Sequence, residues 1–446
     1  MPTQTEAEQQ SIGDSPLASQ PLVAADPSIL SGTSRRVNFG LMAAYQIILR
    51  TGWIFKTESI IMPAVLDTIG GPGWLRGCLP ALNRFGQSVP PMLASAKINA
   101  ASKKKLVLAS STLIMGLSFL ALAALWWSGV RASSGQVPWW MPYAFLAIYA
   151  VFFISTGINQ LTFGTLTGKL IAVDRRGRLM LFASAVGTAS AVACALAVLP
   201  HWLKSGGGRF TAIFAVTGGL FVLAASVILL IREGVDRFDQ PKLDFRGLVR
   251  SAALALVEDK NLRRIAMVSA LFGMSLTLFP HYQALGRQRL GLGFDALIPW
   301  VIAQNIGVAV FSIPAGWLAD RSGNRVVLRC LMSVVCIVPL IALAISHWGE
   351  QAGIGFTLVF FLIGATPVTI RTVTNYCLEL ASREEHSRYL STLGLCTAGP
   401  AIFSAPLVGF LIDRLGFDYV FLMVELFMVV GWWLTLRIVE PRLTTG

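Results

Sequence analysis

The chain has 446 residues, of which 54% are hydrophobic and only 13% are charged, and its formal net charge is +13. A water-soluble protein of this length has no interior large enough for so many apolar side chains, so the composition excludes an ordinary soluble protein. The basic balance alone would also suit a nucleic-acid-binding protein.

The first residues differ in composition from the rest of the chain. We expect residues 1–36, which are rich in Ser, Gln, Ala, Pro and Thr, to be a disordered cytoplasmic tail. The tail carries scattered acidic residues and no continuous apolar run, so it is not typical of a cleaved signal peptide.

Apolar runs of about 20 residues follow and predict membrane-spanning helices. The fold class predicted is an all-α membrane protein with twelve transmembrane helices in two pseudo-symmetric six-helix bundles, at residues 37–231 and 264–440. A charged linker, residues 232–263, separates the bundles. The expected spans are 38–65, 75–96, 106–128, 142–168, 179–203, 210–231, 264–285, 296–318, 327–347, 354–379, 388–412 and 419–438.

The positive charges alternate between the two sides of these spans. If the N-terminus is cytoplasmic, the inner segments hold 25 of the 36 Lys and Arg residues and the outer segments hold 7. This bias follows the positive-inside rule and predicts a multi-pass protein of the cytoplasmic (inner) membrane with both termini in the cytoplasm. The net charge is therefore a topology signal, and we expect no nucleic-acid partner.

The first span contains three ionisable residues, Arg50, Lys56 and Glu58. In one continuous helix Arg50 and Glu58 lie near the same face, and we expect Lys56 to reach toward the outer interface. Arg84 lies midway along the second span and Arg371 lies in the tenth. Ionisable side chains inside a membrane are costly and face a cavity or a partner.

These arginines predict a binding site for a small anionic or zwitterionic solute, because a guanidinium binds carboxylate or phosphate through two parallel hydrogen bonds. The alternative is a structural bridge in which Glu58 pairs with Arg84 or Lys56. The candidate substrate-binding residues are Arg50, Arg84, Arg371, Asn159, Gln160, Gln304, Asn305 and Asn375.

Glu58 is the leading candidate for a proton-coupling group. Burial disfavours the charged form of a carboxylate whereas a nearby arginine favours it, so the balance can change with access to water. His281 in the seventh span is a second candidate, since imidazole titrates near neutrality. The alternative for His281 is a hydrogen-bonding role at a helix bend, which the adjacent Pro280 predicts.

The charged linker contains a segment with helical amphipathicity, residues 244–258. We expect a helix on the cytoplasmic surface that tethers the two bundles, with docking of a partner as the alternative.

The loop between the eighth and ninth spans reads GWLADRSGNR, from Gly316 to Arg325. Its glycines are expected to let two helices approach closely, and its arginines to stay in the cytoplasmic headgroup region. The equivalent place in the first half reads SAKINAASKKK, residues 95–105, without the Asp-Arg pair.

Weak internal similarity indicates an ancient duplication. At an offset of 221 residues, the segment 83–86 aligns with 304–307, and Asn99 falls opposite Asp320. At an offset of 210, Arg178 aligns with Arg388.

The twelve-span plan, the basic linker and the 316–325 motif resemble the major facilitator superfamily over residues 37–440. The resemblance implies a secondary transporter whose halves rock around a central cavity. It also implies a conformational lock at the cytoplasmic loops, formed by Gly316, Asp320, Arg321, Gly323, Arg325, Arg178 and Arg388.

We therefore expect alternating-access transport of a small solute, with proton coupling as an option. The alternatives are an exporter of amphiphilic compounds and a transporter-like sensor or scaffold that moves nothing. The sequence shows no phosphate-binding loop, metal-ligand spacing or dinucleotide fingerprint, so we expect no cofactor, no metal and no enzymatic activity. The expected partners are the solute and the lipid bilayer, with protons as an option, and the expected state is a monomer.

Overall fold

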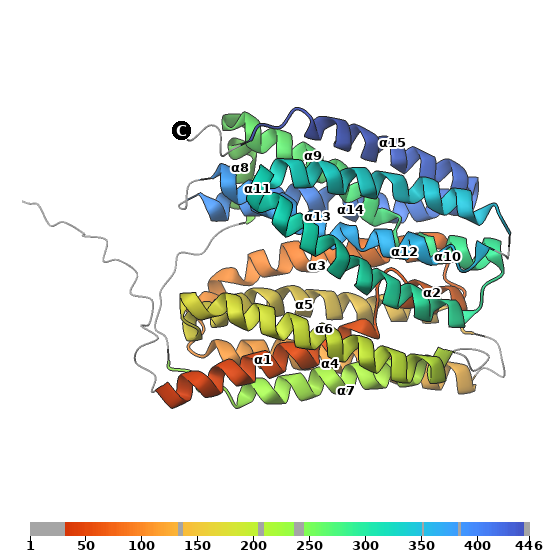
Figure 1. The fold of residues 1–446 in the computed structure, drawn as a ribbon. Helices are drawn as coiled ribbons and strands as arrows, with labels where there is room; N and C mark the ends of the chain where they lie inside the picture. Colours follow the sequence, from red (N-terminus) through yellow and green to blue (C-terminus); the bar gives the residue numbers. More distant parts are fainter. Residues whose placement is uncertain are drawn as a thin grey trace, which may run out of the picture.

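The computed structural model describes residues 32–132, 137–203, 209–235, 245–349, 352–381 and 385–440. The expected tail lies outside the described residues as far as residue 31. Within these ranges the chain forms helices joined by short loops, and the helices run roughly parallel in two halves (Figure 1).

The N-terminal half contains α1 Gly32–Ile54, α2 Ile61–Thr68, α3 Gly73–Ala100, α4 Lys104–Ala132, α5 Met141–Leu170, α6 Val173–Leu203 and α7 Phe210–Leu229. The C-terminal half contains α8 Phe245–Glu258, α9 Lys260–Thr277, α10 Phe279–Leu290, η2 Phe294–Ala296, α11 Leu297–Ser346, α12 Thr357–Ile363, α13 Ala365–Leu380, α14 His386–Leu415 and α15 Phe417–Thr435.

Twelve spans arise from these helices. Among the described residues, nine helical segments are long and apolar enough to cross a membrane, and one of them, Phe294–Ser346, contains two spans. Those two spans join at Gly323, whose φ of 81° lies in the left-handed region that favours glycine. The pair α1–α2 and α3, which carry more polar residues, supply the remaining two spans.

We call the end of the molecule at which α8 lies the linker end, and the opposite end, where α2 and α10 lie, the far end (Figure 1). The linker helix is fastened to the C-terminal half, because α8 packs against α9 and α14. Arg388 Nη2 also bonds Glu258 Oε2 at 2.6 Å. Residues 236–244 of the linker lie outside the described residues.

The prediction of a continuous first span is wrong. The helix breaks at residues 55–60, where the Thr57 carbonyl accepts N–H groups from Ile60, Ile61 and Met62. Arg50 and Glu58 therefore do not share one helical face. Irregular backbone at membrane depth is tolerated where protein or a water-filled cavity surrounds it.

Glycines set the closest helix contacts inside each half. A Cβ at Gly157 of α5 would lie 1.9 Å from the Gly86 carbonyl oxygen of α3, and a Cβ at Gly307 of α11 would lie 2.0 Å from the Phe361 carbonyl oxygen of α12. Gly86 and Gly307 are opposite each other at the offset of 221 residues. The second span thus meets the fourth as the eighth meets the tenth, in agreement with the expected duplication.

We expect Gly157→Ala to destabilise the fold by about 1–3 kcal/mol, the usual cost of overpacking. The new methyl group meets backbone atoms of α3, which cannot rotate away as a side chain can. The thermal unfolding midpoint of the detergent-solubilised protein should fall. Gly164→Ala is the matched control on the same helix, since a Cβ there meets nothing within 4 Å. Equal unfolding midpoints for the two variants would contradict the close backbone contact of α5 with α3 at Gly157.

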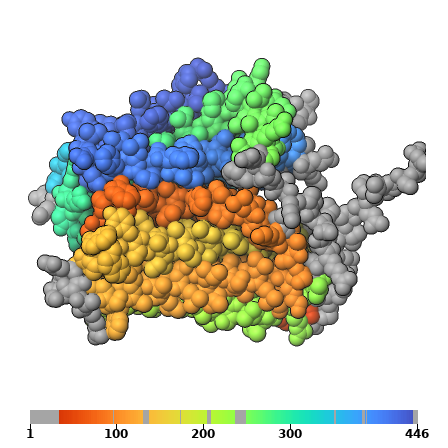
Figure 2. Space-filling model, turned by 180° about the vertical axis from the view of Figure 1, so that it is seen from behind, coloured from red at the N-terminus to blue at the C-terminus, as the bar shows by residue number. Residues whose placement is uncertain are grey.

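The two halves meet along a seam formed by α3 and α14, the blue helix lying on the orange one in Figure 2. Gly73 and Gly77 on α3 face Ala405 and Gly409 on α14. A Cβ at Gly77 would lie 2.0 Å from the Ala405 carbonyl oxygen, and a Cβ at Gly409 would lie 2.1 Å from the Gly73 carbonyl oxygen. Small residues four apart on both helices therefore let the two backbones touch.

Each half is closed at the linker end by a glutamate that follows its last helix. Glu233 Oε1 and Oε2 accept the N–H groups of Lys104 and Lys105 at 2.9 and 2.8 Å, and Lys169 Nζ pairs with Glu233 at 2.8 Å. In the other half, Arg325 Nε lies 3.7 Å from Glu440 Oε2. Glu233 thus contacts the start of α4, the third span of the N-terminal half. Glu440 contacts the part of α11 that follows Gly323, which is the third span of the C-terminal half.

Candidate functional site

A polar network joins the two halves at the far end. Arg76 Nη1 bonds Asp67 Oδ1 at 2.5 Å and its Nη2 lies 3.7 Å from Asp413 Oδ1 on α14. Asp413 Oδ2 also accepts the Gly73 N–H at 2.6 Å, and Gln283 Nε2 of α10 donates to Asp67 Oδ2 at 2.8 Å. We call Asp67, Arg76, Asp413 and Gln283 the far-end network.

His281 lies beside this network, on the first turn of α10. Its side chain is fully buried, and within the described residues neither ring nitrogen has a hydrogen-bond partner. Arg76 is close enough to act on it electrostatically. The helix break expected beside Pro280 is confirmed, because α9 ends at Thr277 and α10 begins at Phe279.

The break in the first span brings Lys56 and Glu58 into the N-terminal bundle. Lys56 is only 1% exposed, so the expectation that it reaches the outer interface is wrong. Its Nζ lies 3.4 Å from the ring centre of Trp53 and 4.6 Å from that of Phe152, and it pairs with Glu58. Aromatic faces and a carboxylate together compensate the buried ammonium.

Glu58 links the first span to the second. Its other oxygen accepts a hydrogen bond from Asn83 Nδ2 on α3, and Asn83 in turn accepts one from Gln87 at 2.7 Å. Arg84, between these two residues in sequence, is within electrostatic reach of Glu58. The structural bridge named as the alternative for Glu58, with Arg84 or Lys56 as partner, is thus made with Lys56.

Next to Glu58, a hydrogen bond crosses between the halves. Ser59 Oγ donates to Gln304 Oε1 of α11 at 2.7 Å. Gln304, a predicted substrate-binding residue, therefore holds the broken first span against the C-terminal half.

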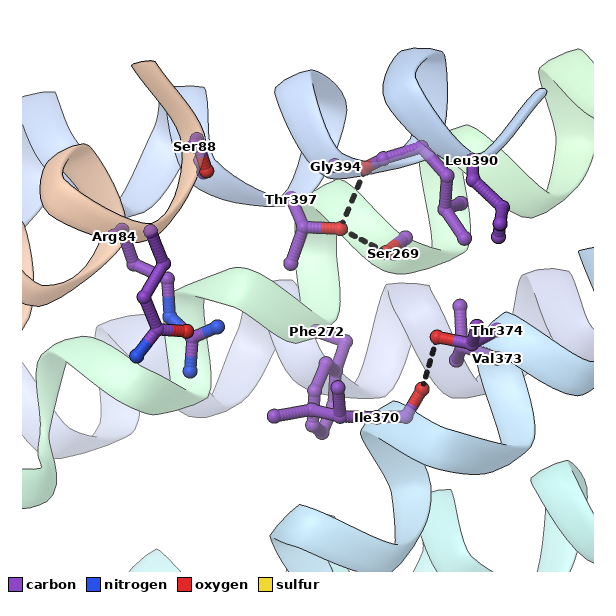
Figure 3. Close-up of a pocket in the computed structure, with 13 residues that line it drawn as sticks. Arg84, Ser88, Ser269, Phe272, Ile370, Val373, Thr374, Leu390, Gly394 and Thr397 are labelled. Carbon is purple, nitrogen blue, oxygen red and sulfur yellow. Dashed lines mark hydrogen bonds between the residues drawn. The ribbon is translucent and has the colours of Figure 1, made fainter. Parts of the chain in front are cut away.

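A pocket of about 170 Å³ lies between the halves, on the linker side of these contacts (Figure 3). One wall is α3, and the other walls are α9, α13 and α14. Arg84 is the cationic residue among those that line it. The lining residues are Arg84, Gln87, Ser88, Ser269, Phe272, Ile370, Val373, Thr374, Leu390, Leu393, Gly394, Thr397 and Ala398.

The other two predicted arginines lie on different halves, within electrostatic range of each other. Arg371 of α13 is exposed and acts electrostatically on Arg50 of α1, whose Nη1 donates to Ser184 Oγ at 3.2 Å. Within the described residues, Arg50, Arg84 and Arg371 form no ion pair. Because Lys56 and Glu58 neutralise each other, the three guanidinium groups leave an excess charge of +3.

The predicted neutral residues fall into different surroundings. Asn159 is buried inside the N-terminal bundle and bonds Tyr45, Ser111 and Thr112, so the structure does not place it in the pocket. Its side-chain amide is hydrogen-bonded to residues of the neighbouring spans α1 and α4.

Three further predicted residues lie outside the pocket's lining. Gln160 on α5 is exposed and is not among the residues that line the pocket. Asn375 on α13 is also exposed. Asn305 Nδ2 donates to the Val301 carbonyl of its own helix at 2.8 Å.

The residues of the expected lock lie at the linker end. Asp320 and Arg321 are exposed, and Arg321 stacks on Trp317 at 4.1 Å. The expectation that Gly316 permits close helix packing is wrong for this conformation, because a Cβ there would meet nothing within 4 Å. Gly323 is the glycine that the turn requires.

The two aligned loop arginines differ in their contacts. Arg178 is exposed at the start of α6. Arg388 bonds Glu258 and lies 3.6 Å from Glu385.

Sequence reasoning missed the far-end network. Arg76 and Asp413 stand at the ends of the expected spans 75–96 and 388–412, and 337 positions separate them in sequence. The available signal was the pair of small-residue repeats, Gly73 with Gly77 and Ala405 with Gly409, which marks helices that pack closely.

Comparison with known proteins agrees with this arrangement. Residues 291–445 match the family model described as Major Facilitator Superfamily, whereas no curated protein matches the sequence. A variant of the nucleoside transporter NupG has a similar structure, with a TM-score of 0.68, 13% identity, and coverage of 91% of this chain and 99% of that one. The E. coli fucose:proton symporter FucP has a TM-score of 0.55 and 14% identity, with coverage of 91% of this chain and 100% of that one.

A bacterial homologue of the human lysosomal transporter Spinster, in an inward-facing and unoccupied conformation, has a TM-score of 0.61 at 11% identity, with coverage of 92% and 99%. At such identities the likeness concerns the fold. Residues 291–445 thus match the model of the Major Facilitator Superfamily, and the fold across both halves is similar to that of solved membrane transporters.

Proposed function

We propose that the protein is a secondary transporter that carries a small organic anion by alternating access, with proton coupling through Glu58. The observation that carries the proposal is Arg84, which lines the pocket between the halves and has no ion pair among the described residues. Arg50 and Arg371 add two further charges between the halves. An anion bound there relieves the cost of holding guanidinium groups inside a membrane.

The geometry supports access from the linker end. The far-end network and the close contact of Gly73 and Gly77 with α14 close the far end. The pocket, in contrast, extends to Leu390, near the start of α14 at the linker end. Opening the far end requires Arg76 and Gly73 to release Asp413. This movement of one half against the other would expose the same arginines to the opposite side.

Proton coupling follows from competition for Arg84. An ionised Glu58 compensates both Lys56 and Arg84, so it lowers the attraction of Arg84 for an incoming anion. Protonation of Glu58 removes this competition and leaves the Lys56 ammonium to the ring faces of Trp53 and Phe152. An anion at Arg84 compensates the local positive charge in place of Glu58, so anion binding and protonation favour each other. The two ligands therefore bind with positive coupling, which predicts symport of the anion with a proton.

The test is uptake of labelled organic anions into proteoliposomes, with protein-free liposomes as the blank. We expect uptake to rise when the outside is made acidic. The variant Glu58→Gln with Lys56→Met, which removes both charges of the buried pair, should lose this dependence on the pH gradient. Removing Glu58 alone would leave Lys56 buried and unpaired, at a cost of about 3–5 kcal/mol.

Glu425→Gln is the matched control, because Glu425 is also a buried carboxylate but lies on α15, away from the seam. It should keep the wild-type gradient dependence. Ligand binding without flux of any anion would favour the sensor alternative and sink the transport proposal. An unchanged gradient response in the double variant would remove Glu58 from the coupling step.

A further inference from the structure

The pocket is divided in chemistry between the two halves. The N-terminal half contributes Arg84, Gln87 and Ser88, all polar. The C-terminal half contributes mainly apolar side chains, among them Phe272 and Ile370, whose side chains project into the same space as that of Arg84 in Figure 3. A ligand that fills the pocket therefore meets charge on one side and hydrocarbon on the other.

The hydroxyl groups on the apolar side are already engaged. Ser269 and Thr397 bond each other, and Thr397 also donates to the Leu393 carbonyl at 2.8 Å. Thr374 donates to the Ile370 carbonyl at 3.0 Å. The side chains on this wall therefore offer a sugar or nucleoside a few hydroxyl oxygens as acceptors and otherwise hydrocarbon, which disfavours a ligand with many hydroxyl groups.

The volume limits the apolar part of the ligand. A cavity of about 150 Å³ in another protein stays dry and accepts benzene. The present pocket, of about 170 Å³, thus has room for one ring or one branched alkyl group beside the guanidinium of Arg84. With Arg84 as the cationic residue of its lining, the pocket matches a ligand that presents one negative charge to the N-terminal half.

We propose that the substrate class is a compact monocarboxylate with an apolar body of about the size of a benzene ring, either aromatic or branched aliphatic. The carboxylate bonds Arg84 of the N-terminal half, and the apolar body packs on Phe272, Ile370 and Leu393 of the C-terminal half. This inference rests on the proposed function, because it assumes that Arg84 binds the transported anion. Such a ligand contacts both halves at once, so its binding favours the conformation in which the two halves are close together around the pocket.

The test is equilibrium binding of labelled benzoate to the purified protein in detergent, which avoids passive leakage of the free acid through lipid. Unlabelled benzoate and 3-methylbutanoate should compete at least tenfold better than acetate, and benzamide, which keeps the ring but lacks the charge, should not compete. Phe272→Ala should weaken benzoate binding at least tenfold and leave acetate competition unchanged.

Phe403→Ala is the matched control, since Phe403 lies on α14 but is 83% exposed on the outer surface. It should bind benzoate as the wild type does. If phosphate, citrate or acetate binds and benzoate does not, the monocarboxylate inference is overturned while anion transport stands. If no anion binds or is transported, both proposals fail.

Discussion

Replacing Arg84 with methionine is expected to weaken anion binding about a hundredfold or more and to abolish measurable transport. The change removes two charge-assisted hydrogen bonds, each contributing about 1.5–3 kcal/mol. Methionine fills a similar volume, and Glu58 keeps Lys56 and Asn83 as partners, so the bundle should remain folded. Binding of a labelled anion in detergent and uptake in proteoliposomes measure the two effects separately.

Arg84→Lys separates charge from shape at this position. Lysine keeps the positive charge but lacks the planar two-pronged geometry, so it should restore part of the binding. Arg437→Met is the control, because Arg437 is exposed at the linker end and stacks on Trp433 at 3.8 Å. Full transport by Arg84→Met would refute the proposed site.

The second large effect is expected from Gly77→Ala, which should prevent the far end from closing. The added methyl group would lie 2.0 Å from the Ala405 carbonyl oxygen and 2.9 Å from the Pro406 Cα, both on the opposite half. Since each 1.4 kcal/mol changes an equilibrium tenfold, a clash of this kind reverses the balance between closed and open far ends. Transport should fall at least tenfold, because a carrier held open on one side cannot complete its cycle.

Pulsed electron resonance distances provide the direct measurement. Spin labels at Trp139→Cys and Ile354→Cys, both exposed at the far end of different halves, should move apart when Gly77→Ala is added to a background without the native cysteines. Gly164→Ala should leave the distance distribution as it is. A distribution unaffected by Gly77→Ala would show that the seam does not control closure.

The fold was accessible from sequence because membrane spans are local signals. A run of apolar residues is long enough to identify a helix on its own, and alternating loop charges give the order of the spans. The linker helix and the helix break beside Pro280 were also visible, since both depend on residues that are neighbours in the chain.

Contacts between distant residues were not accessible in the same way. The break at residues 55–60 lies inside an apolar run, and its cause is that Lys56 and Glu58 are compensated by Trp53, Phe152 and Asn83 inside the bundle. A helical wheel assumes the continuous helix that these contacts interrupt.

The polar residues inside spans were ambiguous for a related reason. An asparagine in a membrane helix can face a cavity or join two neighbouring helices. Asn159 joins helices, through Tyr45 and Thr112, whereas Arg84 on α3 lines the pocket. Only the surrounding helices decide between these roles, and the sequence of one span does not describe them.

The glutamates that close each half, Glu233 and Glu440, bear on how such a chain arose. In the first half the loop motif has lost its Asp-Arg pair, yet a basic segment still meets the acid that follows the sixth span. Each half therefore carries its own link between its last span and its third, independent of the other half. If the halves descend from one duplicated ancestor, the seam and the linker are the parts that only the joined chain requires, and the linker keeps the two halves at a high effective concentration.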